Sequence, residues 1–266
     1  MILGLRVAVT AGYGKSLHAI ALVHSLAARG HAVVLCVQVR ALNVGRLRGY
    51  LRQIGLRKLW GKVRAKLFAS SGDYAGEVAA MQAFNREHHV SSSSLADECG
   101  VGNVRHLLVT RLDDPAVAAA VRESGADLIV YAGGGIVRSE LLKATRLGVL
   151  NAHGGPLPRF RGMNAAEWAL LHGIAPTVTI HWMNEGIDTG PILFERPIPA
   201  EAWRTIADGR GVATRVGVEA LLDAVDRVAA ENVPAMPQDV EAGRQYHVMA
   251  DPLLEVLERR LQTTNA

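Results

Sequence analysis

The first forty residues follow the order strand, glycine turn, helix, strand, and this order constrains the fold more than any other feature of the chain. Residues 5–12 are a short apolar run with β-branched side chains that ends in glycine, which is typical of a buried strand. Residues 15–29 place apolar side chains at helical spacing, Gly30 suits the end of that helix, and residues 31–39 read as a second strand. Strands joined by a helix in this way lie parallel. The sequence therefore predicts an α/β fold with a mostly parallel sheet and helices on both faces.

The same alternation of strands and helices returns further along the chain. The predicted elements are strand 104–109, helix 115–124, strand 127–132, helix 139–145, strand 149–153, helix 165–172, strands 177–183 and 192–197, and helices 212–231 and 253–261. We expect residues 1–235 to form one core domain, with a basic helical insertion at 40–70. Residues 236–266 are expected to be a C-terminal tail that packs on the core.

The insertion has an unusual charge pattern. Nine Lys and Arg residues lie between Arg40 and Lys66, with no acidic residue among them. Apolar residues recur between them at helical spacing, which predicts two short amphipathic helices. Two interpretations stay open. The segment is either a solvated or packed pair of helices, or an electrostatic surface that attracts a nucleotide-linked or membrane-associated substrate.

Composition restricts the class of protein. The chain has 266 residues, 49% of them hydrophobic, which is enough to bury a sizeable core. Its formal net charge of +4 is compatible with an anionic substrate without requiring one. Cys36 and Cys99 provide neither a disulfide framework nor a metal site, which favours a reducing compartment. Because we recognise no signal peptide and no apolar run near the roughly 18 residues of a membrane span, we expect a cytoplasmic protein without integral membrane association.

The glycine turn TAGYGKS at residues 10–16 resembles two phosphate-binding motifs but completes neither. The Walker pattern needs glycine where Val9 stands, and the dinucleotide fingerprint needs glycine or alanine where Leu17 stands. A tight strand-to-helix turn explains these residues. Binding of a substrate phosphate by backbone N–H groups and Lys15 at the helix start stays open.

Asn151 and His153 form the first part of a candidate site. Alternate residues of a strand project from the same face, so both side chains of strand 149–153 point the same way. They stand at the carboxyl end of the strand, where open α/β sheets bind their ligands. Asp188 follows strand 177–183 in a glycine-rich turn, from which a carboxylate can point back at a neighbouring strand.

An amide, an imidazole and a carboxylate together suit acyl transfer to an amine. Attack of the amine on a carbonyl forms a tetrahedral oxyanion, which the Asn151 amide and a protonated His153 can stabilise. Asp188 can hold the imidazole or accept the amine proton through a water. Each residue alone also has a structural interpretation: a loop-capping Asn, a buried structural His or a solvated turn Asp. His181 is a further candidate for lining the site.

The motifs together resemble a known family. The chain carries Asn151-x-His153, then LPRFRG at residues 157–162, then DTG at residues 188–190. Over residues 127–195 it is similar to the 10-formyltetrahydrofolate-dependent formyltransferases. This resemblance implies a Rossmann-like formyltransferase fold. It also implies transfer of a formyl group from 10-formyltetrahydrofolate to an amine.

The resemblance also implies residue roles. Asn151, His153 and Asp188 would be the catalytic residues. The pterin would lie between two segments, which consist of Gly135, Ile136 and Val137 in the first and of Asn184, Glu185, Gly186 and Ile187 in the second. The chain departs from many members at two places, with Gly155-Pro156 where they have serine-leucine and Ala165 where they have proline.

The acceptor separates the branches of this family. Methionyl-tRNA formyltransferases carry an additional C-terminal barrel, for which the tail after Pro234 is too short, so we expect no tRNA acceptor. The segment from Arg161 to Gly173 resembles the members that formylate amino sugars on nucleotide carriers. It favours a small-molecule amine, either an amino sugar or a specialised metabolite. A nucleotide-linked acceptor and a homodimer stay open.

Two other functions remain as alternatives. A formyl-folate hydrolase would use the same three residues with water as the acceptor. A sugar-nucleotide-binding, glycosyltransferase-like protein would share the opening βαβ unit, but it needs a second Rossmann domain of comparable size, for which the chain is too short.

Overall fold

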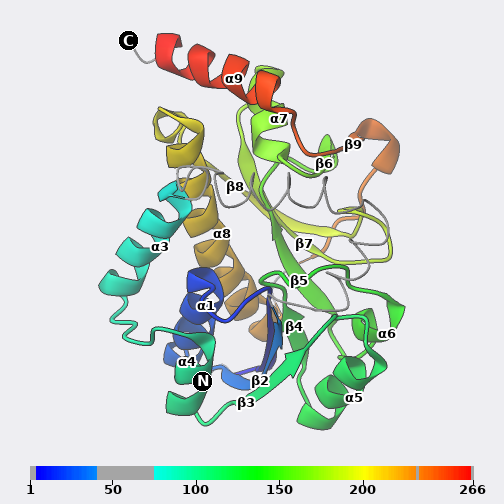
Figure 1. Ribbon diagram of the computed structural model, residues 1–266. Coiled ribbons are helices and arrows are strands. Elements are labelled where there is room, and N and C mark those ends of the chain that lie inside the picture. The colour runs from blue at the N-terminus through cyan, green and yellow to red at the C-terminus, as the bar shows by residue number, and fades with distance from the viewer. Residues whose placement is uncertain (1–3, 41–74, 232–233, 265–266) are drawn as a thin grey trace, which may run out of the picture.

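A seven-stranded sheet forms the centre of the computed structural model, which describes residues 4–40, 75–231 and 234–264 (Figure 1). Its strands, in the order β3-β2-β1-β4-β5-β7-β8, are β1 (Arg6–Ala11), β2 (Ala32–Val39), β3 (Arg105–Val109), β4 (Leu128–Val130), β5 (Val149–His153), β7 (Thr177–Trp182) and β8 (Ile192–Pro197). The first five pair in parallel, whereas β7 runs antiparallel to both β5 and β8. The predicted α/β fold with a mostly parallel sheet is confirmed.

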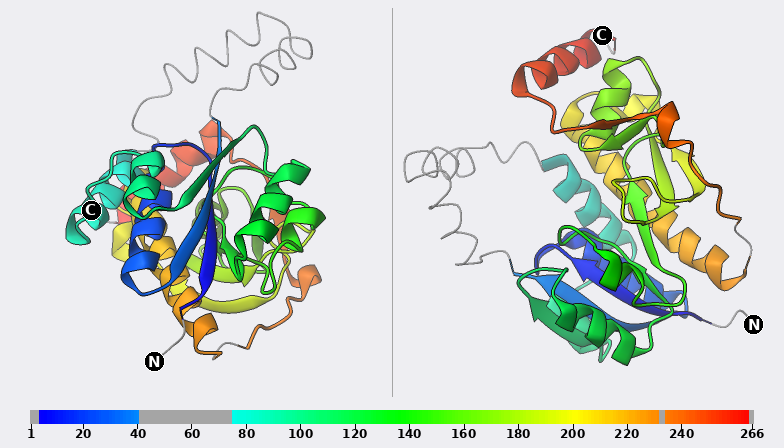
Figure 2. Two further views of the ribbon diagram at one scale, coloured as in Figure 1. Left: turned by 90° about the horizontal axis from the view of Figure 1, so that it is seen from below. Right: turned by 90° about the vertical axis from the view of Figure 1, so that its right-hand side faces the viewer.

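Helices cover both faces of this sheet (Figure 2). One face carries α1 (Leu17–Ala28), α3 (Ala75–Glu87), α4 (Leu95–Val101) and α8 (Ile206–Ala229), and the other carries α5 (Pro115–Ser124) and α6 (Ser139–Leu142). The side chains of β1 alternate between the two layers, because Val7 and Val9 pack on the first face and Ala8 packs on the second. Within the described residues, no helix combines the length and the apolar character needed to cross a bilayer.

A second, two-stranded sheet joins the C-terminal tail to the rest of the fold. β6 (Phe160–Gly162) pairs in parallel with β9 (Arg244–Tyr246). α7 (Ala165–Leu171) packs beside this small sheet and α9 (Asp251–Thr264) packs against α7 (Figure 1), and short 3₁₀ turns occupy Ala200–Ala202 and Val240–Ala242. The tail side chains Met249 and Leu257 are buried. The tail therefore packs on the element that directly follows β5.

The structure contains elements that the sequence did not predict. Neither β6 nor β9 was predicted, because three residues are too few to show a period. α3 was missed since its buried side is narrow, limited to Met81, Phe84 and Asn85. α8 begins six residues before its predicted start, where the Thr205 hydroxyl caps the helix by accepting the backbone N–H of Asp208. The predicted basic insertion lies, apart from Arg40, outside the described residues.

Candidate active site

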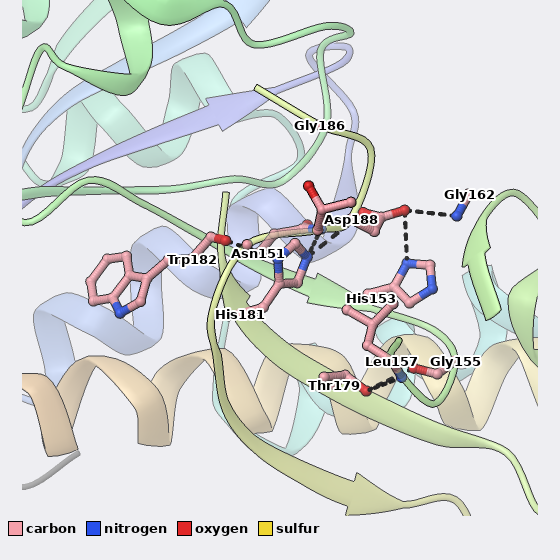
Figure 3. A network of polar contacts seen from close by, with 12 residues as sticks. Asn151, His153, Gly155, Leu157, Gly162, Thr179, His181, Trp182, Gly186 and Asp188 are labelled. Carbon is pink, nitrogen blue, oxygen red and sulfur yellow. Dashed lines mark hydrogen bonds and ion pairs between the residues drawn. The ribbon is translucent and has the colours of Figure 1, made fainter. Parts of the chain in front are cut away.

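Asn151 and His153 lie at the carboxyl end of β5, between β4 and β7, and Asp188 lies in the turn between β7 and β8 (Figure 3). His153 is buried, and its Nδ1 atom stands 3.4 Å from Oδ2 of Asp188. Asp188 has a φ of 53°, a left-handed conformation that turns its side chain back toward β5. The three residues named from the sequence therefore meet at one place.

The imidazole of His153 is held by a backbone carbonyl. Its Nε2 atom lies 2.7 Å from the carbonyl oxygen of Phe160, which can only accept, so Nε2 carries a hydrogen and donates it. Nδ1 is left facing the carboxylate of Asp188. A proton taken up at Nδ1 would lie between the imidazole and a negative charge, which stabilises it there.

His181 lies directly opposite Asn151 in the antiparallel ladder between β5 and β7. Its Nδ1 atom donates to the carbonyl oxygen of Trp182 at 3.0 Å, so its Nε2 atom accepts the Asn151 amide N–H, also at 3.0 Å. Burial lowers the pKa of His181 to about 4, and His153 shifts it in the same direction. A neutral His181 thus fixes the Asn151 amide with its nitrogen toward β7. The second hydrogen of that amide is left for a ligand.

We expect His181 to make the protein less stable as the pH falls from 6.5 to 4. The unfolded chain protonates this histidine near pH 6.5 and the folded chain near pH 4, so the unfolded state binds more protons between these values. The stabilisation is fully present above pH 6.5, and roughly 3 kcal/mol is lost by pH 4. Urea unfolding at pH 7.0 and pH 4.5 should show a larger difference for the parent than for His181→Gln. An equal difference in both proteins would contradict the assignment.

The turn that carries Asp188 is fastened from two sides. The backbone N–H of Gly162 donates to Oδ2 of Asp188 at 2.8 Å. The Gln238 side chain, from the tail, donates to the backbone carbonyl oxygens of Asp188, at 3.2 Å, and of Gly190. Gly190 has no room for a side chain, because a Cβ there would overlap the carbonyl oxygen of Trp182. Contacts of the backbone of this turn therefore help to position the Asp188 carboxylate, in addition to the contact that the carboxylate itself makes.

The short strand β6 holds both ionisable members of the site. Phe160 supplies the carbonyl that accepts from His153, and Gly162 supplies the N–H that binds Asp188. β6 is in turn paired with β9 of the tail. The tail therefore supports the site in two ways, through this pairing and through Gln238. None of these supporting contacts could be read from the sequence, because Phe160 and Gly162 act through backbone atoms and Gln238 acts from a distant part of the chain.

For the formyl transfer that the resemblance implies, we predict that Gln238→Leu lowers kcat while leaving the Michaelis constant of the expected donor within about twofold. Losing two hydrogen bonds frees the Asp188 turn, and a loss of about tenfold in kcat corresponds to roughly 1.4 kcal/mol. Gln238→Glu should be worse, because it sets a carboxylate against two carbonyl oxygens. Steady-state kinetics on the three proteins test this order. Gln262→Leu, on the exposed surface of α9, is the control. An unchanged kcat in both Gln238 variants would show that the contact does not position Asp188.

The two segments expected to contact a pterin lie next to each other beside this turn. The Ser139 hydroxyl, at the start of α6 and two residues after the first segment, donates to the Glu185 carboxylate of the second. The Tyr131 hydroxyl donates to the carbonyl oxygen of Gly135 at 2.8 Å. Ile136 is 70% exposed and Ile187 is 52% exposed, each in one of the two segments. Exposed aliphatic side chains at this place provide an apolar surface.

The remaining predicted residues of these segments lie as follows. Val137 is buried in the layer of α5 and α6. Asn184 shapes its own loop, since its side-chain oxygen accepts the backbone N–H of Gly186 at 3.1 Å and the Thr189 hydroxyl at 2.7 Å.

Two cavities flank the end of β5 on the side of α8. One, of ≈290 Å³, is lined by Asn151 and by residues of α1, α3 and α8. The other, of ≈270 Å³, is lined by His153 and by residues of α3, α7 and α8. The glycine turn lines neither of them, and Ser16 at its end caps α1 by accepting the N–H of Ala19. Each cavity thus opens beside one of the two polar residues of β5.

The two departures from the family pattern are neighbours in space. A Cβ on Gly155 would lie 2.5 Å from the Cβ of Ala165, at the first residue of α7. A small residue at each position lets the loop after β5 approach the start of α7 closely. Gly155 and Ala165 therefore act on the same wall of the cavity beside His153, which Ala165 lines.

A comparison with known protein families matches residues 65–225, more than half of the chain, to the formyl transferase family. The chain belongs to the formyl transferase family. The resemblance stated from the sequence is thereby confirmed, as is the prediction of an enzyme class. Among the matched residues are Asn151, His153 and Asp188.

Curated relatives of this formyl transferase chain match part of its length. Methionyl-tRNA formyltransferase of Symbiobacterium thermophilum is 37% identical over 150 residues, which cover 56% of this chain and 46% of that protein. Methionyl-tRNA formyltransferase of Syntrophus aciditrophicus is 39% identical over 132 residues, which cover 48% of this chain and 42% of that protein. The chain therefore spans less than half of the length of these two relatives.

Solved structures agree with the fold over nearly the whole chain. Glycinamide ribonucleotide transformylase 1 from Symbiobacterium toebii superposes with a TM-score of 0.59 at 19% identity, covering 89% of this chain and 96% of that one. A protein from Mycobacterium tuberculosis, proposed to be a sugar N-formyltransferase, superposes with a TM-score of 0.55 at 15% identity, covering 97% and 87%. The Rossmann-like formyltransferase fold is thus confirmed.

Proposed function

We propose that this protein is an N-formyltransferase that moves a formyl group from 10-formyltetrahydrofolate to the amine of a small molecule. The observation that carries the proposal is the meeting of Asn151, His153 and Asp188 beside two cavities, with His153 and Asp188 3.4 Å apart. A fixed amide donor next to an imidazole–carboxylate pair is what acyl transfer to an amine requires. Residues 1–235 would be the catalytic core, and residues 236–266 would be a tail that supports it.

Each residue has a role in this proposal. Asn151 uses one amide hydrogen on His181 and offers the other to the carbonyl oxygen that becomes negative during attack. His153 accepts the proton that the amine loses as the new C–N bond forms, and Asp188 stabilises the resulting imidazolium. The same proton then passes to the nitrogen that leaves as the old C–N bond breaks.

The segments at residues 135–137 and 184–187 fit the proposed donor. A flat heterocycle needs apolar contact on its faces and hydrogen-bond groups at its edge. Exposed Ile136 and Ile187 supply the first, and the neighbouring backbone supplies the second. When bound, the folate supplies a formyl group carried on nitrogen and therefore open to attack by an amine.

Two acceptor classes compete in this proposal. We favour a small-molecule amine, an amino sugar or a specialised metabolite, because the segment from Arg161 to Gly173 resembles the sugar-formylating branch. Methionyl-tRNA is the second candidate, favoured by 37% identity to the Symbiobacterium thermophilum enzyme. A nucleotide-linked acceptor and a homodimer belong to the same proposal as open alternatives.

The test is formyl transfer in solution. The protein is incubated with 10-formyltetrahydrofolate and a panel of amines that includes free and nucleotide-linked amino sugars and methionyl-tRNA. Tetrahydrofolate release and the mass of the product identify the acceptor. Formate release without any amine would instead support the hydrolase alternative. No turnover with any acceptor, together with no folate binding by calorimetry, would remove the proposal.

A further inference from the structure

Glu77 is the ionisable residue that lines both cavities of the candidate site. The two cavities share Glu77, Gly154, Ala213 and Thr214 among the described residues. Gly154 directly follows His153, so the shared wall runs past the end of β5. Glu77 belongs to the first turn of α3, which packs against α8. A carboxylate on α3 therefore stands where the two cavities meet.

Close packing of the two helices sets the position of Glu77. A Cβ on Gly76 would overlap the carbonyl oxygen of Ala207 at the start of α8. A Cβ on Gly211 would lie 2.5 Å from the carbonyl oxygen of Gly76. Because larger residues at either glycine would push the helices apart, this pair of glycines brings α3 close to α8. The position of Glu77 is thus a consequence of backbone contact rather than of a flexible loop.

The polar groups nearest to Glu77 bond to one another. Arg210 donates to Glu167 at 2.6 Å, and Asn164 donates to the same Glu167 oxygen at 3.1 Å. The Glu77 carboxylate makes no hydrogen bond or ion pair with another residue of the described part of the chain. Burial raises the pKa of Glu77, with nearby Arg210 acting in the opposite direction. A carboxylate accepts only, so a half-buried one is stabilised by a partner with N–H or O–H groups.

Much of the surrounding wall is apolar. The cavity beside Asn151 is lined by Leu22, Val178, Val218 and Leu221, among others. An apolar wall lowers the local dielectric, which strengthens any hydrogen bond made to Glu77. An anionic group of a ligand, such as a phosphate, would be repelled by the Glu77 carboxylate if it lay beside it.

We propose that Glu77 binds hydrogen-bond donors of the acceptor substrate, so the acceptor is an amine that carries hydroxyl groups or a second ammonium near its reacting nitrogen. The part of the acceptor that faces α3 is neutral or cationic, and any phosphate it carries lies elsewhere. This inference rests on the proposed formyl transfer, and it narrows the acceptor class. Glu77 acts in it as a residue that determines specificity, whereas the reacting atoms contact Asn151 and His153.

The experiment compares the parent, Glu77→Gln and Glu77→Ala with four acceptors. These are an amino sugar, 1,4-diaminobutane, butylamine as the amine without further donors, and an amino-sugar phosphate. The glutamine variant keeps the size of the side chain and removes the charge. The matched control is Glu123→Gln on α5, an exposed residue on the other face of the sheet. The amino sugar and the diamine distinguish hydroxyl groups from a second ammonium as the source of the donors.

We expect Glu77→Gln to raise the KM of the best acceptor at least tenfold, with the KM of the folate unchanged and a smaller change in kcat. The preference of the parent for the donor-rich acceptors over butylamine should shrink in both Glu77 variants and persist in the control. If the parent transfers formyl groups and Glu77→Gln leaves acceptor KM and preference as they were, this inference is wrong while the proposed function stands. If the parent neither turns over nor binds folate, both are wrong.

Discussion

Replacing His153 by alanine is expected to lower kcat/KM for formyl transfer by about 10³-fold, while folate binding is retained. In the proposed mechanism the imidazole takes the proton of the attacking amine at Nδ1, since Nε2 already donates its hydrogen to Phe160, and Asp188 then faces the protonated ring. Alanine removes this proton acceptor and leaves Asp188 with the Gly162 N–H but without the imidazole. Steady-state kinetics with the best acceptor, together with folate titration by calorimetry, measure the two effects separately.

A control substitution and a stability measurement distinguish a loss of catalysis from a loss of folding. His247 is exposed, and the contact recorded for it is its backbone carbonyl, which accepts from the Trp168 indole N–H at 3.0 Å. His247→Ala should therefore keep nearly full activity. The thermal unfolding midpoint of His153→Ala shows whether the variant stays folded at the assay temperature. A folded His153→Ala protein with activity within tenfold of the parent would contradict the role of this imidazole.

The sequence was sufficient to place the sheet and one edge of the site. Short apolar runs predicted every strand of the large sheet, and the signal is clearest where helices cover both faces of a strand, as in β1 and β4, because such strands need continuous apolar residues. Asn151 and His153 could be placed on one face from strand periodicity alone. Their relation to Asp188 rested on the resemblance, since the pairing of β5 with β7 is a contact between distant segments that no local pattern records.

His181 could be named from the sequence as a candidate for lining the site, but the contacts that complete the site had no signal in a single sequence. His181 faces Asn151 only because β7 pairs with β5 in one register, and a shift by one residue would turn it to the opposite face. The groups from Phe160 and Gly162 that hold the site are backbone atoms, which every residue carries. Gln238 lies fifty residues beyond the turn it fastens. These contacts follow from tertiary packing and could be recognised only in the structure.

Asp188→Asn is expected to lower kcat by about 10³-fold with little change in the KM of either substrate. The amide keeps an oxygen for the N–H of Gly162 but removes the negative charge that stabilises a proton on His153. Asp114→Asn is the matched control, because Asp114 caps α5 and asparagine caps a helix equally well. The decisive protein is the double variant His153→Ala with Asp188→Asn. If the two residues act as one unit, the double variant loses little more than the worse single variant. Multiplied losses would mean that the imidazole and the carboxylate work independently, and the 3.4 Å contact between them would then have no catalytic meaning.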